Sequence, residues 1–224
     1  LVRSGRWPTP VEAVVTARLP DAVLVKRDDL SGLGRGGAKA RKIEHLLGHL
    51  LAHGHDELVT VAGHVTNLAF DLVPVLDRHG IRVTLFIADD PPAAPSDREA
   101  VFRELRDRVT FLGAGRAEAA RAAVGPWTAG RRAGRRPFLL LPGASHPACI
   151  AGNACGMLEM AAQLEDAGRP LPRRVYVSAA TGTTIAGFLI AEHALRRAGR
   201  APMAVTGVQV YPGPVRHQTL ALVR

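Results

Sequence analysis

Short apolar runs rich in β-branched residues alternate with longer segments of helical periodicity along most of this chain. The predicted strands are 22–26, 57–62, 81–87, 109–112, 138–141, 174–178 and 203–210, and the predicted helices are 39–53, 66–79, 96–107, 147–167 and 183–198. Strands that alternate with helices imply right-handed crossovers and a mostly parallel sheet. We therefore expect an α/β fold whose ligands bind where strands end and helices begin.

The composition is that of a folded protein with room for one large or two small domains. The 224 residues are 47% hydrophobic and 22% charged, with a formal net charge of +9. A nucleic-acid-binding protein gathers its basic residues on one face, whereas here they are scattered. The tightest basic cluster, Arg131-Arg132 with Arg135-Arg136, lies in the Gly-rich stretch 125–136, which favours a solvated turn. The net charge is the only feature that favours nucleic-acid binding, and we therefore expect no nucleic-acid partner.

The two cysteines, Cys149 and Cys155, are not spaced as a zinc knuckle or a Cys-x-x-Cys redox pair. Two buried thiols in a reducing cytosol is the favoured interpretation, and no metal site is expected. The sequence contains no run of about 20 apolar residues and no charged-then-apolar signal segment at its start. We therefore expect a cytoplasmic protein with no membrane partner.

The first strand-to-helix junction carries a lysine at the end of a glycine-rich loop. Lys26-Arg27-Asp28-Asp29-Leu30 is followed by four glycines and then by Lys39 at a predicted helix start. Glycines let the backbone approach a ligand closely, and a helix N-terminus offers unpaired N–H groups. A lysine amine held there has a lowered pKa and becomes a better nucleophile. Lys42 lies one turn on and can meet an anion, although an ordinary solvated lysine also fits this pattern.

Two later junctions are rich in hydroxyl and amide side chains. Thr66 and Asn67 open the second helix, where they suit either capping or a hydrogen bond to a ligand oxygen. At the third junction, N–H groups and hydroxyls converge in the run Ala180, Thr181, Gly182, Thr183 and Thr184. That run lacks the Gly-Lys-Ser/Thr ending of a nucleotide loop, so a single phosphate on a cofactor fits it better than the triphosphate of a nucleotide. Taken alone, the run also fits a tight turn with capping threonines, and only the other two junctions favour the phosphate site. An amine, an amide and a phosphate cradle are together what pyridoxal 5'-phosphate (PLP) requires.

The lysine motif also resembles a known family signature. The run Gly36-Gly37-Ala38-Lys39-Ala40-Arg41-Lys42-Ile43-Glu44 after residues 26–30 resembles that of the D-cysteine desulfhydrase and 1-aminocyclopropane-1-carboxylate (ACC) deaminase family. These are fold-type-II PLP enzymes, similar in fold to the tryptophan synthase β-subunit. The resemblance runs from Pro8-Thr9-Pro10 to the last strand. It implies two domains of open parallel sheets with flanking helices.

The resemblance also implies domain boundaries and residue roles. The large PLP-binding domain would be formed by 1–44 and 146–224 and would lack its C-terminal part, and 45–145 would form an inserted small α/β domain. Lys39 would form the Schiff base and move the proton, and Thr66 would lie near the substrate carboxylate. Lys42 and residues 180–184 would hold the phosphate, and Asn67 would bond the phenolic oxygen of the cofactor.

Three positions depart from the family pattern in the direction of a less polar pocket. Ala38 stands in place of Asn, Val65 in place of Gln, and Leu68 in place of His or Gln. Members of the family also continue past the strand that ends here near Val210. We therefore expect weak activity from this chain alone.

The function that the resemblance implies is β-elimination from a small amino acid, which yields a 2-keto acid and ammonia. Opening the cyclopropane ring of ACC requires further groups that the sequence does not reveal. A β-replacement enzyme, a dehydratase and a catalytically impaired PLP-binding relative stay open as alternatives. The family resemblance also suggests a homodimer.

Overall fold

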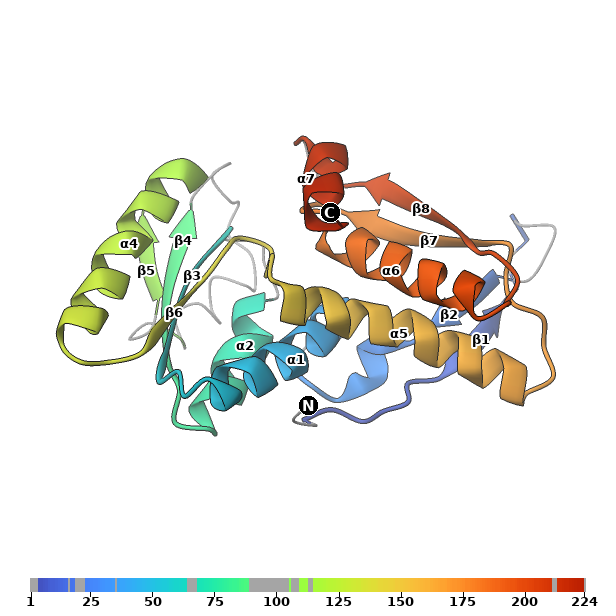
Figure 1. Cartoon of the computed structure of the whole chain (residues 1–224), viewed down its shortest axis with the longest axis horizontal. Coiled ribbons are helices and arrows are strands. Elements are labelled where there is room, and N and C mark those ends of the chain that lie inside the picture. The colour runs from blue at the N-terminus through green and yellow to red at the C-terminus, as the bar shows by residue number, and fades with distance from the viewer. Residues whose placement is uncertain are drawn as a thin grey trace. The chain divides into compact units, whose positions relative to one another are not determined.

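The computed structural model describes residues 4–15, 17–18, 23–34, 36–63, 68–88, 105, 109–112, 115–210 and 213–223. Strands and helices alternate along the chain, as Figure 1 shows. The chain divides into two compact units, one built mainly by Leu46–His146 and the other by Arg3–His45 with Pro147–Arg224. The predicted helix 96–107 falls largely outside the described residues. Among the described helices, none is long and apolar enough to cross a membrane.

The first unit contains a four-stranded parallel sheet in the order β5-β4-β3-β6. Its strands are β3 (Glu57–Gly63), β4 (Arg82–Ala88), β5 (Val109–Leu112) and β6 (Pro137–Leu140), and its helices are α2 (Leu68–Asp77) and α4 (Arg116–Arg132). Strand β3 is buried along six of its seven residues, as expected for a parallel strand between neighbours on both sides. The expectation of an α/β fold with parallel strands and flanking helices is confirmed.

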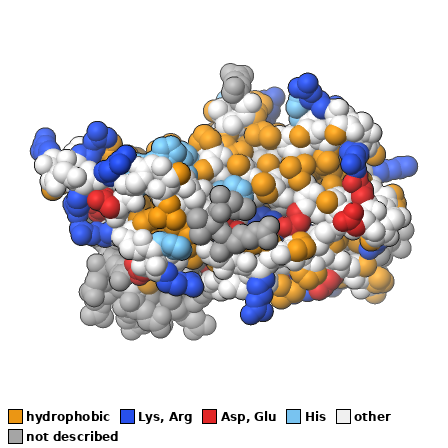
Figure 2. All heavy atoms as spheres, turned by 60° about the horizontal axis from the view of Figure 1, so that its bottom comes forward, with side chains coloured by type: hydrophobic (Ala, Val, Ile, Leu, Met, Phe, Trp, Pro, Cys, Tyr) orange, Lys and Arg blue, Asp and Glu red, His pale blue; other side chains and the backbone are white. Residues whose placement is uncertain are grey.

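Helix α4 was not predicted and occupies part of the stretch interpreted as a solvated turn. The helix continues through Pro126 to Arg132 because its alanines, Ala119 and Ala123 among them, pack against β3 and β4. This packing and the high helix propensity of alanine outweigh one proline. The basic residues of the cluster lie on the last turn of α4 and just beyond it, where Arg135 pairs with the buried Glu57 at 3.3 Å. Figure 2 shows Lys and Arg side chains at several separate places on one face of the molecule.

The second unit combines a short hairpin with a parallel pair of strands. Its elements are β1 (Val11–Val14), β2 (Val23–Lys26), the 3-10 turn η1 (Asp28–Ser31), α5 (Pro147–Asp166), β7 (Arg174–Ala179), α6 (Thr183–Arg197), β8 (Ala204–Gln209) and α7 (Val215–Val223). Helix α1 (Ala38–Ala52) begins in this unit and ends in the first. Strands β7 and β8 are parallel, whereas β1 and β2 are antiparallel, so the predicted strand 22–26 pairs with a strand that the periodicity did not reveal.

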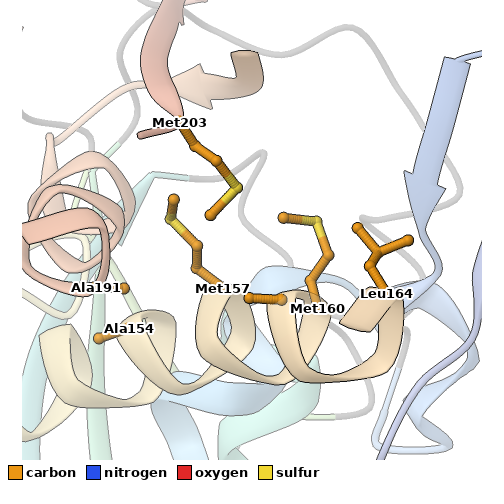
Figure 3. Packing of buried hydrophobic residues seen from close by; sticks show 7 residues of the cluster. Ala154, Met157, Met160, Leu164, Ala191 and Met203 are labelled. Carbon is orange, nitrogen blue, oxygen red and sulfur yellow. The ribbon is translucent and has the colours of Figure 1, made fainter. Parts of the chain in front are cut away.

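The core of the second unit lies where α5 meets α6 and the start of β8. All three methionines of the chain, Met157, Met160 and Met203, lie there with Leu164, and Figure 3 shows their side chains directed toward one another. Thioether side chains adapt to irregular gaps, so they fill this junction of two helices and a strand in a chain that has few aromatic residues. This core fixes α5 beside the strand-to-helix turn that leads into α6.

A cluster of histidines lies in the first unit around Phe138. The ring of His49 lies 4.2 Å from that of His53 and 4.6 Å from that of His146, and His55 stacks beside them at 6.2 Å from His49. Burial, and then the charge of neighbouring histidines, lowers the pKa of His49 and of His146 below the ordinary 6.5. Within the described residues no group of three or more metal-ligating side chains could hold a metal ion. We therefore expect this cluster to make the stability of the first unit depend on pH, through protonation of His49 and His146.

Acidification is expected to destabilise the first unit. Because the pKa values of His49 and His146 are lower in the folded state, the unfolded chain binds protons more tightly, and stability falls as the pH drops from the ordinary histidine value through the lowered ones. Urea unfolding at about pH 7.5 and about pH 5 measures this loss. His146→Gln should reduce the loss, whereas the matched change of exposed His79 to Gln should not. An equal loss in both variants would contradict this account.

Candidate cofactor site

The glycine loop before α1 has a conformation that only glycine adopts readily. Gly36 and Gly37 have φ angles of 73° and 91°, and a Cβ on Gly36 would lie 2.4 Å from the carbonyl oxygen of Asp29. The Gly37 N–H donates to the Asp28 carbonyl at 2.9 Å, which joins the loop to η1. The chain then enters α1 at Ala38, so Lys39 lies in the first helical turn. The predicted helix 39–53 is displaced by one residue.

The chain has only three lysines, and they occupy different environments. Lys26 donates to Glu159 and to the Thr9 carbonyl, both at 2.5 Å. Lys42 is 5% exposed, and burial, together with the charge of Lys39, lowers its pKa to about 8, although Cys149 opposes the shift. Lys39 is half-buried and close enough to Lys42 for their charges to interact. Two amines therefore lie together at the start of α1.

A buried ion network holds this turn of α1 in place. The Arg41 guanidinium, 6% exposed, donates to Asp28 and to Glu159, with Nη2 at 2.8 Å from an oxygen of each, and its Nε donates to Asp28 at 2.9 Å. Burial opposes ionisation of Glu159, but hydrogen bonds from Arg41 and Lys26 lower the pKa of its carboxyl. The network ties the turn of α1 that carries Lys42 to η1 and α5.

Helix α5 approaches α1 at two glycines. A Cβ on Gly152 would lie 2.4 Å from the Arg41 carbonyl oxygen, and one on Gly156 would lie 2.8 Å from the Arg41 side chain. Because the two helices meet almost backbone to backbone at this point, neither can shift without breaking these contacts. The turn of α1 that carries Lys39 and Lys42 is therefore held in a fixed position against α5.

The loop Ala180–Thr184 joins β7 to α6 and provides hydrogen-bond donors. Gly182 precedes the helix with a φ of 79° and no side-chain cap. Thr181 and Thr183 hydroxyls lie 3.3 Å apart, and the first N–H groups of a helix have no partner within it. Hydroxyls and N–H groups at the positive end of a helix are the donors that a phosphate requires. The donors in this loop therefore fit the phosphate of PLP.

Helix α5 brings the lysine turn and the phosphate loop to one place. Its Cys149, whose pKa is raised to about 12 by burial, interacts electrostatically with Lys42. Its Asn153, one turn further on, donates to the Thr183 carbonyl at 3.4 Å. Cys149 and Asn153 therefore connect the amines of α1 with the phosphate loop within the second unit. The prediction from sequence missed both roles, although a buried Asn in an apolar helix, flanked by Gly152 and Gly156, is a visible signal.

Two predicted site residues, Thr66 and Asn67, lie outside the described residues. Leu68, which follows them, begins α2 and is 3% exposed. The roles of Thr66 beside the substrate and Asn67 beside the cofactor ring therefore stay predictions.

Gly182→Ala is expected to weaken both the fold and phosphate binding. An L residue at this φ costs about 1–2 kcal/mol, and the new Cβ would lie 2.4 Å from the Thr219 hydroxyl oxygen on α7. Gly199→Ala is the matched control, because Gly199 has a φ of 75° and open space around its Cβ position. Urea unfolding and PLP titration should show a larger loss for Gly182→Ala than for Gly199→Ala. Equal losses would show that Gly182 has no special contact.

Comparison with known proteins defines the class of this fold and site. The sequence profile of the pyridoxal-phosphate dependent enzymes matches residues 2–222, and the chain belongs to this family. Its cofactor is therefore PLP, which the amines and phosphate loop fit. A crystal structure of an ACC deaminase homologue superposes with a TM-score of 0.85 and 25% identity over 99% of this chain and 67% of that one. A threonine deaminase, whose crystal structure covers 90% of this chain and is itself covered over 59%, shares the fold with a TM-score of 0.66 at 23% identity.

Relatives of similar sequence are named for different reactions. An ACC deaminase of Ralstonia nicotianae is 31% identical over 97% of this chain and 67% of its own length. A nocardicin C-9' epimerase of Nocardia uniformis is 32% identical over 75% of this chain and 52% of its own length. A Pyrococcus abyssi relative is 27% identical over 186 residues, and this chain spans 56% of its length. The chain thus corresponds to little more than half of several relatives.

Proposed function

We propose that this chain supplies the lysine and phosphate-binding parts of a PLP-dependent lyase that performs β-elimination on a small amino acid, as D-cysteine desulfhydrase does. The observation that carries this proposal is that α5 contacts Lys42 through Cys149 and the phosphate loop through Asn153, while Lys39 lies close to Lys42 on α1. When bound, PLP withdraws electrons from the substrate carbon that loses its proton.

Each residue then has a separate task. Lys39 binds the cofactor covalently and afterwards takes the proton from the substrate α-carbon. Lys42, cationic below its pKa of about 8, and residues 180–184 bind the phosphate. Thr66 binds the substrate carboxylate, and Asn67 donates to the phenolic oxygen. For a cysteine substrate, the Cβ–S bond then breaks, sulfur leaves with the electron pair, and hydrolysis releases the 2-keto acid and ammonia.

Deamination of ACC is the second candidate, and the name of the Ralstonia nicotianae relative favours it. The ring-opening reaction also releases a 2-keto acid and ammonia, so the product class does not separate the two. The substrate separates the two reactions, because ACC lacks a leaving group at the β-carbon and cysteine has one.

A substrate panel tests this proposal. The PLP-loaded protein is incubated with D- and L-cysteine, D- and L-serine, L-threonine and ACC, and ammonia and 2-keto acid are measured. We expect the highest release from D-cysteine, and none from the Lys39→Ala variant with any substrate. Highest release from ACC would support the second candidate. Covalently bound PLP with no turnover of any substrate would contradict both and favour a non-catalytic relative.

A further inference from the structure

A cysteine and a histidine outside the proposed cofactor-binding residues form a pair where α1 meets α5. The Cys155 sulfur lies 3.6 Å from His45 Nε2, and His45 Nδ1 lies 3.1 Å from the Arg41 carbonyl oxygen. A carbonyl oxygen can only accept a hydrogen bond, so the Nδ1 carries the proton and Nε2 is the acceptor. The Cys155 thiol therefore donates to His45 Nε2, and His45 Nδ1 donates in turn to the Arg41 carbonyl oxygen, which orients the imidazole.

This arrangement has the parts of an activated nucleophile. A thiol reacts as its thiolate, and an imidazole in hydrogen-bond contact can take the proton. Burial lowers the pKa of His45, so its ring is neutral at neutral pH and its Nε2 can accept the hydrogen bond from the thiol. The imidazole is also held in one orientation by the Arg41 carbonyl.

The other cysteine provides an internal contrast. Cys149 is fully buried, and burial raises its pKa to about 12, so its thiol stays protonated and shielded. Cys155 is exposed to solvent. The two thiols of this chain thus differ in both access and the presence of a base. This separation corrects the prediction that both cysteines are buried.

We propose that Cys155 is a thiol-modification site that reacts with small disulfides by thiol–disulfide exchange. The thiol proton passes to His45 Nε2, and the Cys155 sulfur attacks one sulfur of the disulfide. The S–S bond of the disulfide breaks, the departing thiolate takes the proton, and a mixed disulfide stays on Cys155. Atoms and electrons balance with the disulfide as the only oxidant.

The test uses 2,2'-dithiodipyridine, whose departing thiopyridone absorbs light, on the full chain with PLP present. We expect one fast-reacting thiol per chain, which mass mapping places on Cys155. The fast phase should disappear in Cys155→Ser and persist in Cys149→Ser. Its rate should exceed that of the urea-unfolded chain about 100-fold, the low end of what a positioned base contributes.

The variant His45→Gln tests the role of the base. Its side chain retains polar atoms but cannot act as a base near neutral pH, so the fast phase should slow about 100-fold while circular dichroism and the urea midpoint stay unchanged. An unchanged rate in His45→Gln would overturn the proposal. A fast phase that survives in Cys155→Ser would also overturn it, as would a folded-state rate no higher than that of the unfolded chain.

Discussion

Replacing Lys39 with alanine is expected to abolish covalent attachment of PLP while the chain stays folded. Only three lysines exist, Lys26 is bound to Glu159 and Thr9, and Lys42 is buried beside Cys149. Lys39 is half-buried in the first turn of α1, so truncating it removes little packing. The variant should lose the visible absorbance of covalently bound cofactor, and dialysis should remove all of its PLP.

Lys42→Met provides the comparison for that experiment. It should keep the covalent attachment but weaken PLP binding by about 10- to 100-fold, because a hydrogen bond to a charged group contributes about 1.5–3 kcal/mol. If Lys39→Ala retains borohydride-stable cofactor, or if Lys42→Met alone loses it, the assignment of Lys39 is wrong.

Arg41→Met is expected to reduce the free energy of unfolding of the second unit by about 3–5 kcal/mol. The change keeps most of the aliphatic stem but removes the cation paired with Asp28 and leaves Glu159 with Lys26, in a site where the guanidinium is 6% exposed. A carboxylate that is buried without a partner is strongly destabilising, more so than the intact pair is stabilising. Urea unfolding followed by circular dichroism measures the loss.

Arg27→Met is the matched control for the network. Arg27 also pairs with two carboxylates, Glu12 and Asp29, but these ion pairs are exposed and screened by solvent. Its unfolding midpoint should stay close to that of the unsubstituted chain. Similar midpoints for Arg41→Met and Arg27→Met would contradict the importance given to the buried network.

The predictable part of the fold depended on patterns that are local in the sequence. Strand 57–62 and helix 147–167 were readable because a buried parallel strand is continuously apolar and a buried helix repeats at three and four residues. Helix α4 could not be predicted, because Pro126 and the glycines around it are residues typical of loops. The helix forms because Ala119 and Ala123 pack against the sheet, and no local pattern indicates that packing. Strand β1 has four residues and depends on its pairing with β2.

The candidate site divides in the same way. Glycine loops and helix starts are local, so Lys39, Lys42 and residues 180–184 could be singled out from sequence. The contacts of Asn153 with Thr183 and of Arg41 with Glu159 join residues 30 and 118 positions apart, and no local pattern encodes such distances. The exposed pairing of Cys155 with His45, 110 positions apart, is of the same kind.

The central claim is that Lys39 holds the cofactor, and one measurement tests it directly. The unsubstituted chain is saturated with PLP, reduced with borohydride, digested and mapped by mass spectrometry. We predict a single pyridoxyl group, on Lys39. A pyridoxyl group on Lys26 or Lys42 instead, or no modified lysine under saturating cofactor, would contradict the account.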